Sequence, residues 1–243
     1  MSAFLEIVIN EKNHGTRAVL RGFRLGVAQG EIVSLVGASG CGKSTLLSIV
    51  AGLDRAYRGA VRLDGRPLAG PDADVGLVFQ APRLFPWLSV SQNVVFGAGT
   101  QPDLARADAL LGEVGLQGYG AALPKQLSGG QAQRAAIARG LFLEPRVLLL
   151  DEPFSAVDAF TRMRLQDLLA QAARQRGLTV LLVTHDIDEA LYLSDRVILM
   201  DSVPGPARAE FAVAAPWPRE RRAMAGSLLK PAILDSLHAA HAI

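Results

Sequence analysis

Short apolar runs alternate with amphipathic segments along most of this chain. Continuous apolar runs are typical of strands buried on both faces of a sheet, and apolar residues at 3.6-residue spacing indicate helices. Proline and glycine mark the turns between them. These patterns predict strands over 3–9, 17–28, 31–36, 57–65, 74–80, 147–153, 179–186 and 195–200, and helices over 46–51, 89–94, 104–114, 132–140 and 159–176.

The order of these elements predicts an α/β fold with a β-rich N-terminal lead-in. Residues 81–126 differ in character, with several prolines followed by helical spacing, so we expect a small helical subdomain inserted there. Two aromatic residues of this stretch, Phe85 and Trp87, could form its core or an exposed interface with another protein. The tail has a helical pattern through Leu228, Leu229, Ile233, Leu234 and Leu237, with no evident chemistry.

Residues Gly37-Ala38-Ser39-Gly40-Cys41-Gly42-Lys43-Ser44-Thr45 lie between a predicted strand and a predicted helix. Backbone N–H groups and the helix dipole make such a glycine-rich turn an anion site. The pattern G-x-x-x-x-G-K-[ST] adds Lys43 for the β- and γ-phosphates and Ser44 for Mg²⁺. The stretch therefore predicts binding of a nucleoside triphosphate, with Cys41 as a small filler residue.

Three further predicted strands end in polar residues. Gln80 ends one, Asp151 and Glu152 end another, and His185 ends a third. The carboxyl ends of parallel strands face the ligand crevice of an α/β sheet. Asp151 is then placed to support Mg²⁺, and Glu152 can polarise a water for attack on the γ-phosphate.

A second phosphate-seeking helix start follows the predicted insertion. Ser128, Gly129, Gly130 and Gln131 offer a hydroxyl and bare backbone N–H groups at the beginning of a helix. One nucleotide rarely needs two such ends from one subunit, so this second site calls for an explanation.

Composition argues against some classes of protein and indicates a compartment. The formal net charge of +2 argues against a dedicated nucleic-acid binder, which usually carries a basic stripe. One cysteine allows no internal disulfide, which fits a reducing compartment. The chain has neither an apolar run long enough to span a bilayer nor a signal-peptide pattern, so we expect a cytoplasmic protein, or one bound to a membrane through a partner.

Taken together, these motifs resemble the ATP-binding subunit of an ABC transporter over about residues 3–200. The resemblance rests on 37–45, Gln80, 127–131, 147–153, 155–158 and His185, in the family's order. It implies a single ABC ATPase domain over 1–243, a P-loop NTPase fold with a nucleotide-binding core of 1–80 and 127–215, an inserted helical subdomain of 81–126 and a C-terminal helical tail of 216–243.

The resemblance also implies roles for the site residues. ATP and Mg²⁺ are the cofactors, with Ser44, Gln80 and Asp151 at the metal. Two copies pair head to tail, so that Ser128, Gly130 and Gln131 reach the ATP held by the other copy's phosphate loop. Asp158 communicates between the two sites and His185 contacts the γ-phosphate. Glu152 is the general base we favour, although the motifs alone do not decide between Glu152 and His185.

Two details refine the resemblance. The family usually stacks adenine on an aromatic residue near position 14, where this chain has His14, which offers less stacking area. The stretches 84–90 and 158–162 resemble importer subunits of the nitrate, taurine and aliphatic-sulfonate group. This implies uptake of a small oxyanion, with aliphatic sulfonates the closest guess and taurine or nitrate the alternatives.

The resemblance implies two transmembrane permease subunits, a periplasmic binding protein and a place on the cytoplasmic face of the inner membrane. The helical subdomain and the Gln80 loop would dock the permease. A soluble ABC ATPase of DNA repair or translation is the other class considered. It fits less well for two reasons. Chromosome-type members need a long coiled coil between the two halves of the cassette, and here only 81–126 separates Gln80 from Leu127. Translation-type members usually carry two cassettes, and this sequence shows no repeat. A simple P-loop kinase would leave 127–131 unexplained.

Overall fold

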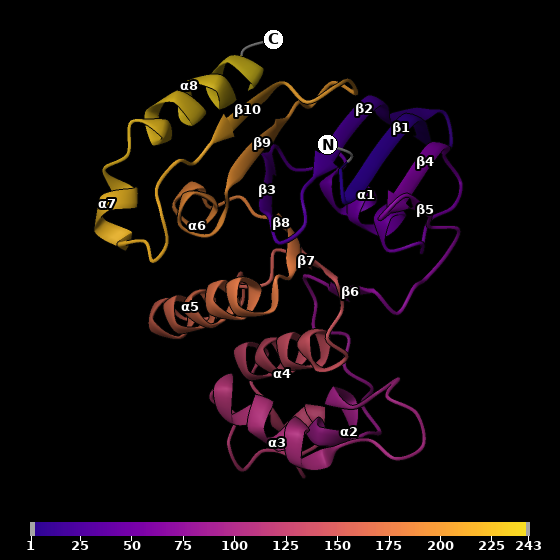
Figure 1. Cartoon of the computed structure of the whole chain (residues 1–243), viewed down its shortest axis with the longest axis vertical. Coiled ribbons are helices and arrows are strands. Elements are labelled where there is room, and N and C mark those ends of the chain that lie inside the picture. Colours follow the sequence, from indigo (N-terminus) through magenta and orange to yellow (C-terminus); the bar gives the residue numbers. More distant parts are fainter. Residues whose placement is uncertain (1–2, 242–243) are drawn as a thin grey trace. The chain divides into compact units, whose positions relative to one another are not determined.

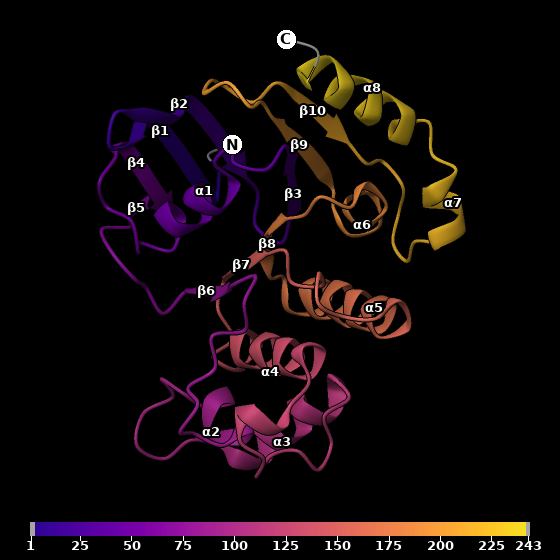
Figure 2. The same cartoon turned by 180° about the vertical axis from the view of Figure 1, so that it is seen from behind.

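The computed structural model describes residues 3–241 and divides into two compact units (Figures 1 and 2). The first unit is Met1–Asp72 with Thr179–Ile243, and the second is Ala73–Leu178. The predicted insertion 81–126 falls within the second unit. Its boundaries, and those of the predicted core and tail, stay predictions.

The first unit begins with a four-stranded antiparallel sheet in the order β2-β1-β4-β5. In β1, Leu5, Ile7 and Ile9 are fully buried and the residues between them are less so, as alternation in a half-buried strand requires. Asp64 and Gly65 have φ values of 53° and 74°, which suit a tight hairpin turn between β4 and β5. The strands are β1 (Leu5–His14), β2 (Arg17–Val27), β4 (Arg58–Leu63) and β5 (Arg66–Pro67).

A second set of strands in the first unit has the order β10-β9-β3-β8. β3, β8 and β9 are parallel, and the short β10 is antiparallel to β9. Because Leu35 pairs with Val183, the carboxyl ends of β3 and β8 meet at the same edge. The elements are β3 (Ile32–Gly37), α1 (Lys43–Val50), β8 (Thr179–Val183), α6 (Ile187–Leu193), β9 (Arg196–Met200) and β10 (Ala209–Ala212).

The C-terminal part of the first unit packs on α6 and β9. Its helices are α7 (Arg221–Ala225) and α8 (Leu229–His241). Ile233 is fully buried, as the predicted helical pattern requires, but Leu228 precedes α8 and is 90% exposed. That part of the pattern was wrong, because a residue before the first helical turn does not share the helix's apolar face.

The second unit contains the parallel pair β6 and β7 and the helices around it. α2, α3 and α4 pack together, and Ser89 caps α2 with a capping box, as the predicted helix start requires. Gly115 has a φ of 70° just after α3, which confirms the predicted stop. The elements are β6 (Val75–Val78), α2 (Val90–Val94), α3 (Leu104–Glu113), a 3₁₀ turn (Pro124–Gln126), α4 (Gly129–Phe142), β7 (Val147–Asp151) and α5 (Ala159–Arg176).

Three aromatic residues of the second unit form a small cluster. Phe85 is half-buried, with its ring centroid 4.3 Å from that of Phe96 and 5.6 Å from that of Trp87. Trp87 is itself 71% exposed, and Phe96 is 51% exposed. Phe85 therefore anchors a small aromatic cluster whose outer rings face solvent.

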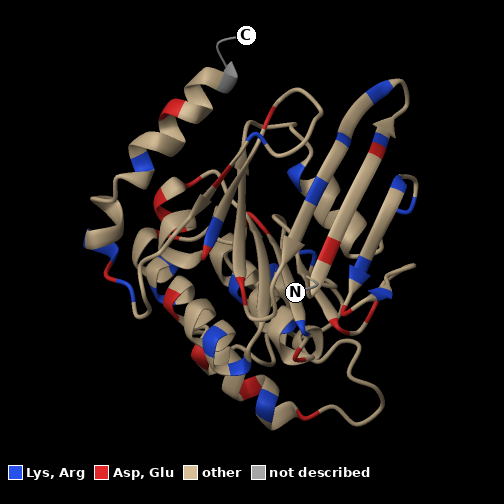
Figure 3. Cartoon of the chain, turned by 45° about the horizontal axis from the view of Figure 1, so that its top comes forward, with Lys and Arg blue, Asp and Glu red and all other residues tan. Residues whose placement is uncertain are grey.

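Charge is spread over the surface with both signs mixed. Figure 3 shows basic and acidic residues interspersed along the strands and helices, in keeping with the formal net charge of +2. Among the described residues, we find no helix with the length and apolar character that a membrane span requires.

Candidate functional site

The glycine-rich loop 37–45 connects β3 to α1 in the first unit. Gly42 caps α1 with a φ of 101°, and a Cβ there would lie 2.8 Å from the Leu20 side chain. A Cβ on Gly37 would lie 2.5 Å from the carbonyl oxygen of Met200. Glycine is therefore required at both positions, by conformation at one and by close packing at the other.

Lys43 is held against this loop. Its Nζ donates to the carbonyl oxygens of Gly37 and Ala38, each at 2.8 Å, and lies 3.6 Å from Cys41 Sγ. Lys43 is buried although it starts a helix, and Ser44 beside it is exposed. The loop thus presents an ammonium group, a hydroxyl and the N-terminal N–H groups of α1, which together can bind phosphate oxygens.

Two histidines lie near this loop in the first unit. Nε2 of His14, at the end of β1, is 3.5 Å from Oγ1 of Thr45. His185 is exposed and follows β8, where the Thr184 N–H donates to the Leu35 carbonyl at 3.3 Å. The chain fold therefore brings both histidines to the edge that carries the phosphate loop.

The second unit places Gln80 beside the carboxylates that end β7. Val78 pairs with Leu150, and just beyond the ends of the two strands Gln80 Nε2 donates to Glu152 Oε2 at 3.2 Å. Glu152 has a φ of +44°, a left-handed conformation that is uncommon for a residue with a side chain. Ser155 stabilises it, because its N–H and its hydroxyl both donate to the Glu152 carbonyl.

Ser128 begins α4 with a reciprocal capping box. Its Oγ accepts from the Gln131 N–H at 3.2 Å, and Gln131 Oε1 accepts from the Ser128 N–H at 2.8 Å. Gly129 and Gly130 form the bare first turn between them. A Cβ on Gly130 would lie 3.1 Å from the Ala156 carbonyl oxygen, so the loop after β7 packs closely against this helix start.

Asp158 connects the loop after β7 to α5. It is the N-cap of α5, and its carboxylate accepts from the Thr161 N–H at 3.0 Å. This backbone hydrogen bond, together with one from the Thr161 hydroxyl, holds the pKa of Asp158 below its ordinary value. The carboxylate therefore has a local role as a helix cap.

Gln133 and Arg139 of α4, which the sequence did not indicate, bind the loop 79–83 that contains Gln80 (the Gln80 loop). The amide of Gln133 is fully buried and donates to the Phe79 carbonyl at 3.1 Å. Arg139 donates to the carbonyls of Pro82 and Arg83, at 3.0 Å and 2.9 Å, and burial lowers its pKa. A polar side chain on the buried face of a predicted helix was the available signal.

The predicted metal ligands have suitable donor chemistry. Ser44, Gln80 and Asp151 supply hydroxyl, carboxamide and carboxylate oxygens, which are the donors that Mg²⁺ prefers. Over the described part of the chain, no group of three or more His, Cys, Asp or Glu side chains forms a metal cage of its own. The residues fit an ion held jointly with substrate phosphates, which is the usual way proteins bind Mg²⁺.

Comparison with known proteins identifies the class. A family model described as ABC transporter matches residues 20–155, more than half of the chain. The chain belongs to the ABC transporter family, and its fold is that of the family's ATP-binding, ATP-hydrolysing subunit.

Individual relatives are similar over their full length. The chain is 56% identical to the aliphatic sulfonates import ATP-binding protein SsuB 1 of Xanthomonas axonopodis pv. citri, covering 99% of this chain and 98% of the relative. It is 53% identical to the protein of the same name from Pseudomonas aeruginosa, over the whole of both chains.

Solved structures agree on the fold. The dimeric ATP-binding cassette MJ0796, in a post-hydrolysis state bound to ADP and phosphate, superposes with a TM-score of 0.77 and 31% identity. It covers 87% of this chain and 100% of that one. CbiO1 of Clostridium perfringens, part of an ABC transporter complex, has a TM-score of 0.76 at 28% identity, covering 97% and 99% of the two chains.

Proposed function

We propose that this chain is the ATP-hydrolysing subunit of an importer that takes up aliphatic sulfonates through a membrane permease. The observation that carries the substrate class is the 53–56% identity, over essentially full length, to proteins named for aliphatic sulfonate import. The phosphate loop of the first unit and the Gln80–Glu152 pair of the second supply the chemistry that ATP hydrolysis needs.

In this proposal the first unit binds the phosphates and the adenine ring of ATP. The N–H groups of 37–45 and the ammonium of Lys43 bind the β- and γ-phosphates, where the helix dipole of α1 adds partial positive charge. His14, beside Thr45, stacks on the adenine ring. His185, at the end of β8, contacts the γ-phosphate.

Most of the groups proposed for hydrolysis belong to the second unit. Ser44, Gln80 and Asp151 would hold Mg²⁺, which when bound neutralises charge on the β- and γ-phosphates. Glu152 accepts a proton from the attacking water as general base. The hydrogen bond from Gln80 and the turn at Ser155 orient its carboxylate before the substrate arrives.

The second anion-binding helix end belongs to a shared site. We propose that Ser128, Gly129, Gly130 and Gln131 contact the ATP bound by another copy, so that two copies enclose two nucleotides. Asp158, next to this helix start, passes information between the two sites. The dimeric state of the solved cassette MJ0796 supports this arrangement.

The remaining partners follow from an importer's architecture. We propose two transmembrane permease subunits and a periplasmic binding protein, with this chain peripheral on the cytoplasmic face of the inner membrane. The Gln80 loop and the helical subdomain dock the permease. The outward-facing rings of Trp87 and Phe96 support that surface, since exposed aromatic clusters are typical of protein interfaces.

Growth of a strain lacking this gene tests the substrate class. When ethanesulfonate is the sole sulfur source, we expect the strain to grow only if the gene is restored. Growth on sulfate is the control and should not depend on the gene. Dependence with taurine as sulfur source or nitrate as nitrogen source, but not with ethanesulfonate, would replace the proposed substrate. Independence from the gene in every medium would contradict a role in this import.

A further inference from the structure

Arg219 is a buried arginine that binds the end of α6. Its side chain is 1% exposed, and its NH1 donates to the carbonyl oxygens of Leu191, Tyr192 and Ser194 at 2.7–3.2 Å. Leu191 and Tyr192 belong to the last turn of α6 and Ser194 is its C-cap, where carbonyl groups lack helical partners. A guanidinium there satisfies them and interacts favourably with the helix dipole.

The same guanidinium connects α6 to the segment that follows β10. Nε donates to the Ala215 carbonyl at 3.0 Å and NH2 to the Val213 carbonyl at 3.2 Å. Arg219 also forms an ion pair with Asp195 at 3.7 Å, and its guanidinium carbon lies 4.8 Å from the centroid of the Trp217 ring. Arg219 thus joins the C-terminal segment to the end of α6 through a side chain that is almost wholly removed from water.

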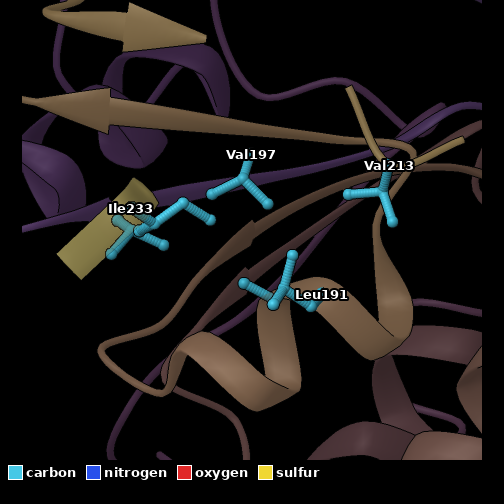
Figure 4. Close-up of a cluster of buried hydrophobic side chains, with 6 residues drawn as sticks. Leu191, Val197, Val213 and Ile233 are labelled. Atoms are coloured by element: carbon cyan, nitrogen blue, oxygen red, sulfur yellow. The ribbon is translucent and has the colours of Figure 1, made fainter. Parts of the chain in front are cut away.

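Two other features hold α6 along its length. Lys230 of α8 donates to Asp188, in the first turn of α6, at 2.7 Å. Between the two ends, Leu191 packs in a buried cluster with Val197, Val213 and Ile233 (Figure 4). We call the segment 209–237 that supplies Arg219, Val213, Lys230 and Ile233 the C-terminal clamp.

The helix that the clamp holds follows directly after His185. The Thr184 hydroxyl accepts from the Asp186 N–H at 3.0 Å, and Asp186 caps α6 by accepting from the Glu189 N–H at 3.1 Å. His185 therefore lies between the end of β8 and a helix start with little backbone freedom. A shift of α6 would move the histidine.

We propose that Arg219 is a positioning residue for ATP hydrolysis, which fixes α6 through the C-terminal clamp and thereby sets the place of His185. This inference rests on the proposed contact of His185 with the γ-phosphate. It gives the C-terminal segment, in which the sequence indicated no chemistry, a part in the rate of turnover.

A double-mutant cycle tests the proposal in the full-length protein. Arg219→Met should lower kcat about tenfold, because sub-ångström misplacement of a reacting group is costly, while the Kd for ATP stays within about twofold. Arg222→Met, an exposed arginine of α7, is the matched control and should leave kcat unchanged. In a His185→Ala background, Arg219→Met should cause no further loss of kcat, since the group it positions is gone.

Each outcome of the cycle is informative. The positioning role would be overturned if the fold-reductions of kcat in the two single variants multiplied in the double variant, or if kcat were unchanged in Arg219→Met. Either result would leave the proposed function intact. An unchanged kcat in His185→Ala would instead remove His185 from the proposed mechanism, and the inference with it. If Arg219→Met does not fold, Arg219→Lys repeats the cycle, because it keeps the charge and loses most of the fork's hydrogen bonds.

Discussion

Glu152 combines an uncommon backbone conformation with a hydrogen bond to Gln80. A left-handed φ at a non-glycine residue costs free energy and persists only where surrounding contacts enforce it. Here the Ser155 turn and the Gln80 amide provide those contacts. An orienting hydrogen bond and a fixed backbone are what a general base requires, which favours Glu152 for that role.

Changing Glu152 to Gln should separate binding from hydrolysis. The amide is isosteric and leaves the phosphate loop untouched, but it cannot accept the proton of the attacking water. We expect steady-state phosphate release to fall by about 10²–10⁴-fold while ATP binding remains. Glu113→Gln, an exposed glutamate at the end of α3, is the control and should hydrolyse ATP normally. Normal turnover in Glu152→Gln would transfer the role of base to another group.

At the scale of residues, the sequence indicated the motif residues as candidates and missed the residues that contact their loops. Lys43 and Glu152 were identifiable because fixed spacing and strand-end position indicate their chemistry. Gln133, Arg139 and Arg219 bind main-chain carbonyls that are distant in sequence. A carbonyl has no residue identity, so such partnerships become visible only in three dimensions.

Among the elements, α4 contributes to two parts of the candidate site. Its first turn is free of side-chain bulk at Gly129 and Gly130 and is closed by the Ser128–Gln131 box. Further along, Gln133 and Arg139 hold the loop that follows β6. A ligand that contacts the start of α4 would therefore act on the same rigid element that fixes the Gln80 loop.

Substituting Ser128 with Arg tests whether this helix start serves another copy's nucleotide. The long side chain should block that approach and abolish hydrolysis, while the isolated monomer still binds ATP through its own phosphate loop. Loss of the cap should also reduce the unfolding free energy by about 1 kcal/mol. Gln171→Arg, at an exposed position of α5, adds the same charge and should leave turnover unchanged. Failure of the Ser128→Arg monomer to bind ATP would contradict the shared site.

The cap of α5 gives the fold a defined pH dependence. Since the backbone hydrogen bond from Thr161 lowers the pKa of Asp158, the ionised carboxylate stabilises the folded state above its ordinary pKa of 3.8. That contribution is lost as the pH falls through the lower, folded-state value. Asp158→Asn keeps a good cap without the charge.

Urea unfolding of both proteins between pH 7 and pH 3 measures this effect. The wild type should lose more unfolding free energy than Asp158→Asn as the pH falls. Equal losses in the two proteins would show that the Asp158 carboxylate has the same pKa in the folded and unfolded states.

Element prediction succeeded where caps and periodicity were strong. The range of α5 matches its prediction, 159–176, because Asp158 and Gly177 mark its ends. The short elements α6, α7 and β10 were not predicted. α6 has only seven residues and its last five are buried, so it shows no amphipathic period that a sequence pattern could reveal.

At the scale of the whole molecule, both units carry candidate site residues. The first carries the phosphate loop and both histidines, and the second carries Gln80, the β7 carboxylates and the start of α4. The family and its fold were predictable, because several short motifs in a fixed order are specific together. The transported substrate was less accessible, because the motifs from which the family was predicted concern ATP and not the transported molecule.

The most direct test of the account is ATP-driven uptake by the assembled transporter. A deletion strain restored with the wild-type gene should accumulate labelled ethanesulfonate, and the same strain carrying Glu152→Gln at equal protein level should not. This result would tie sulfonate import to hydrolysis by this chain. Equal accumulation in the two strains, or none with the wild type, would contradict the central claim.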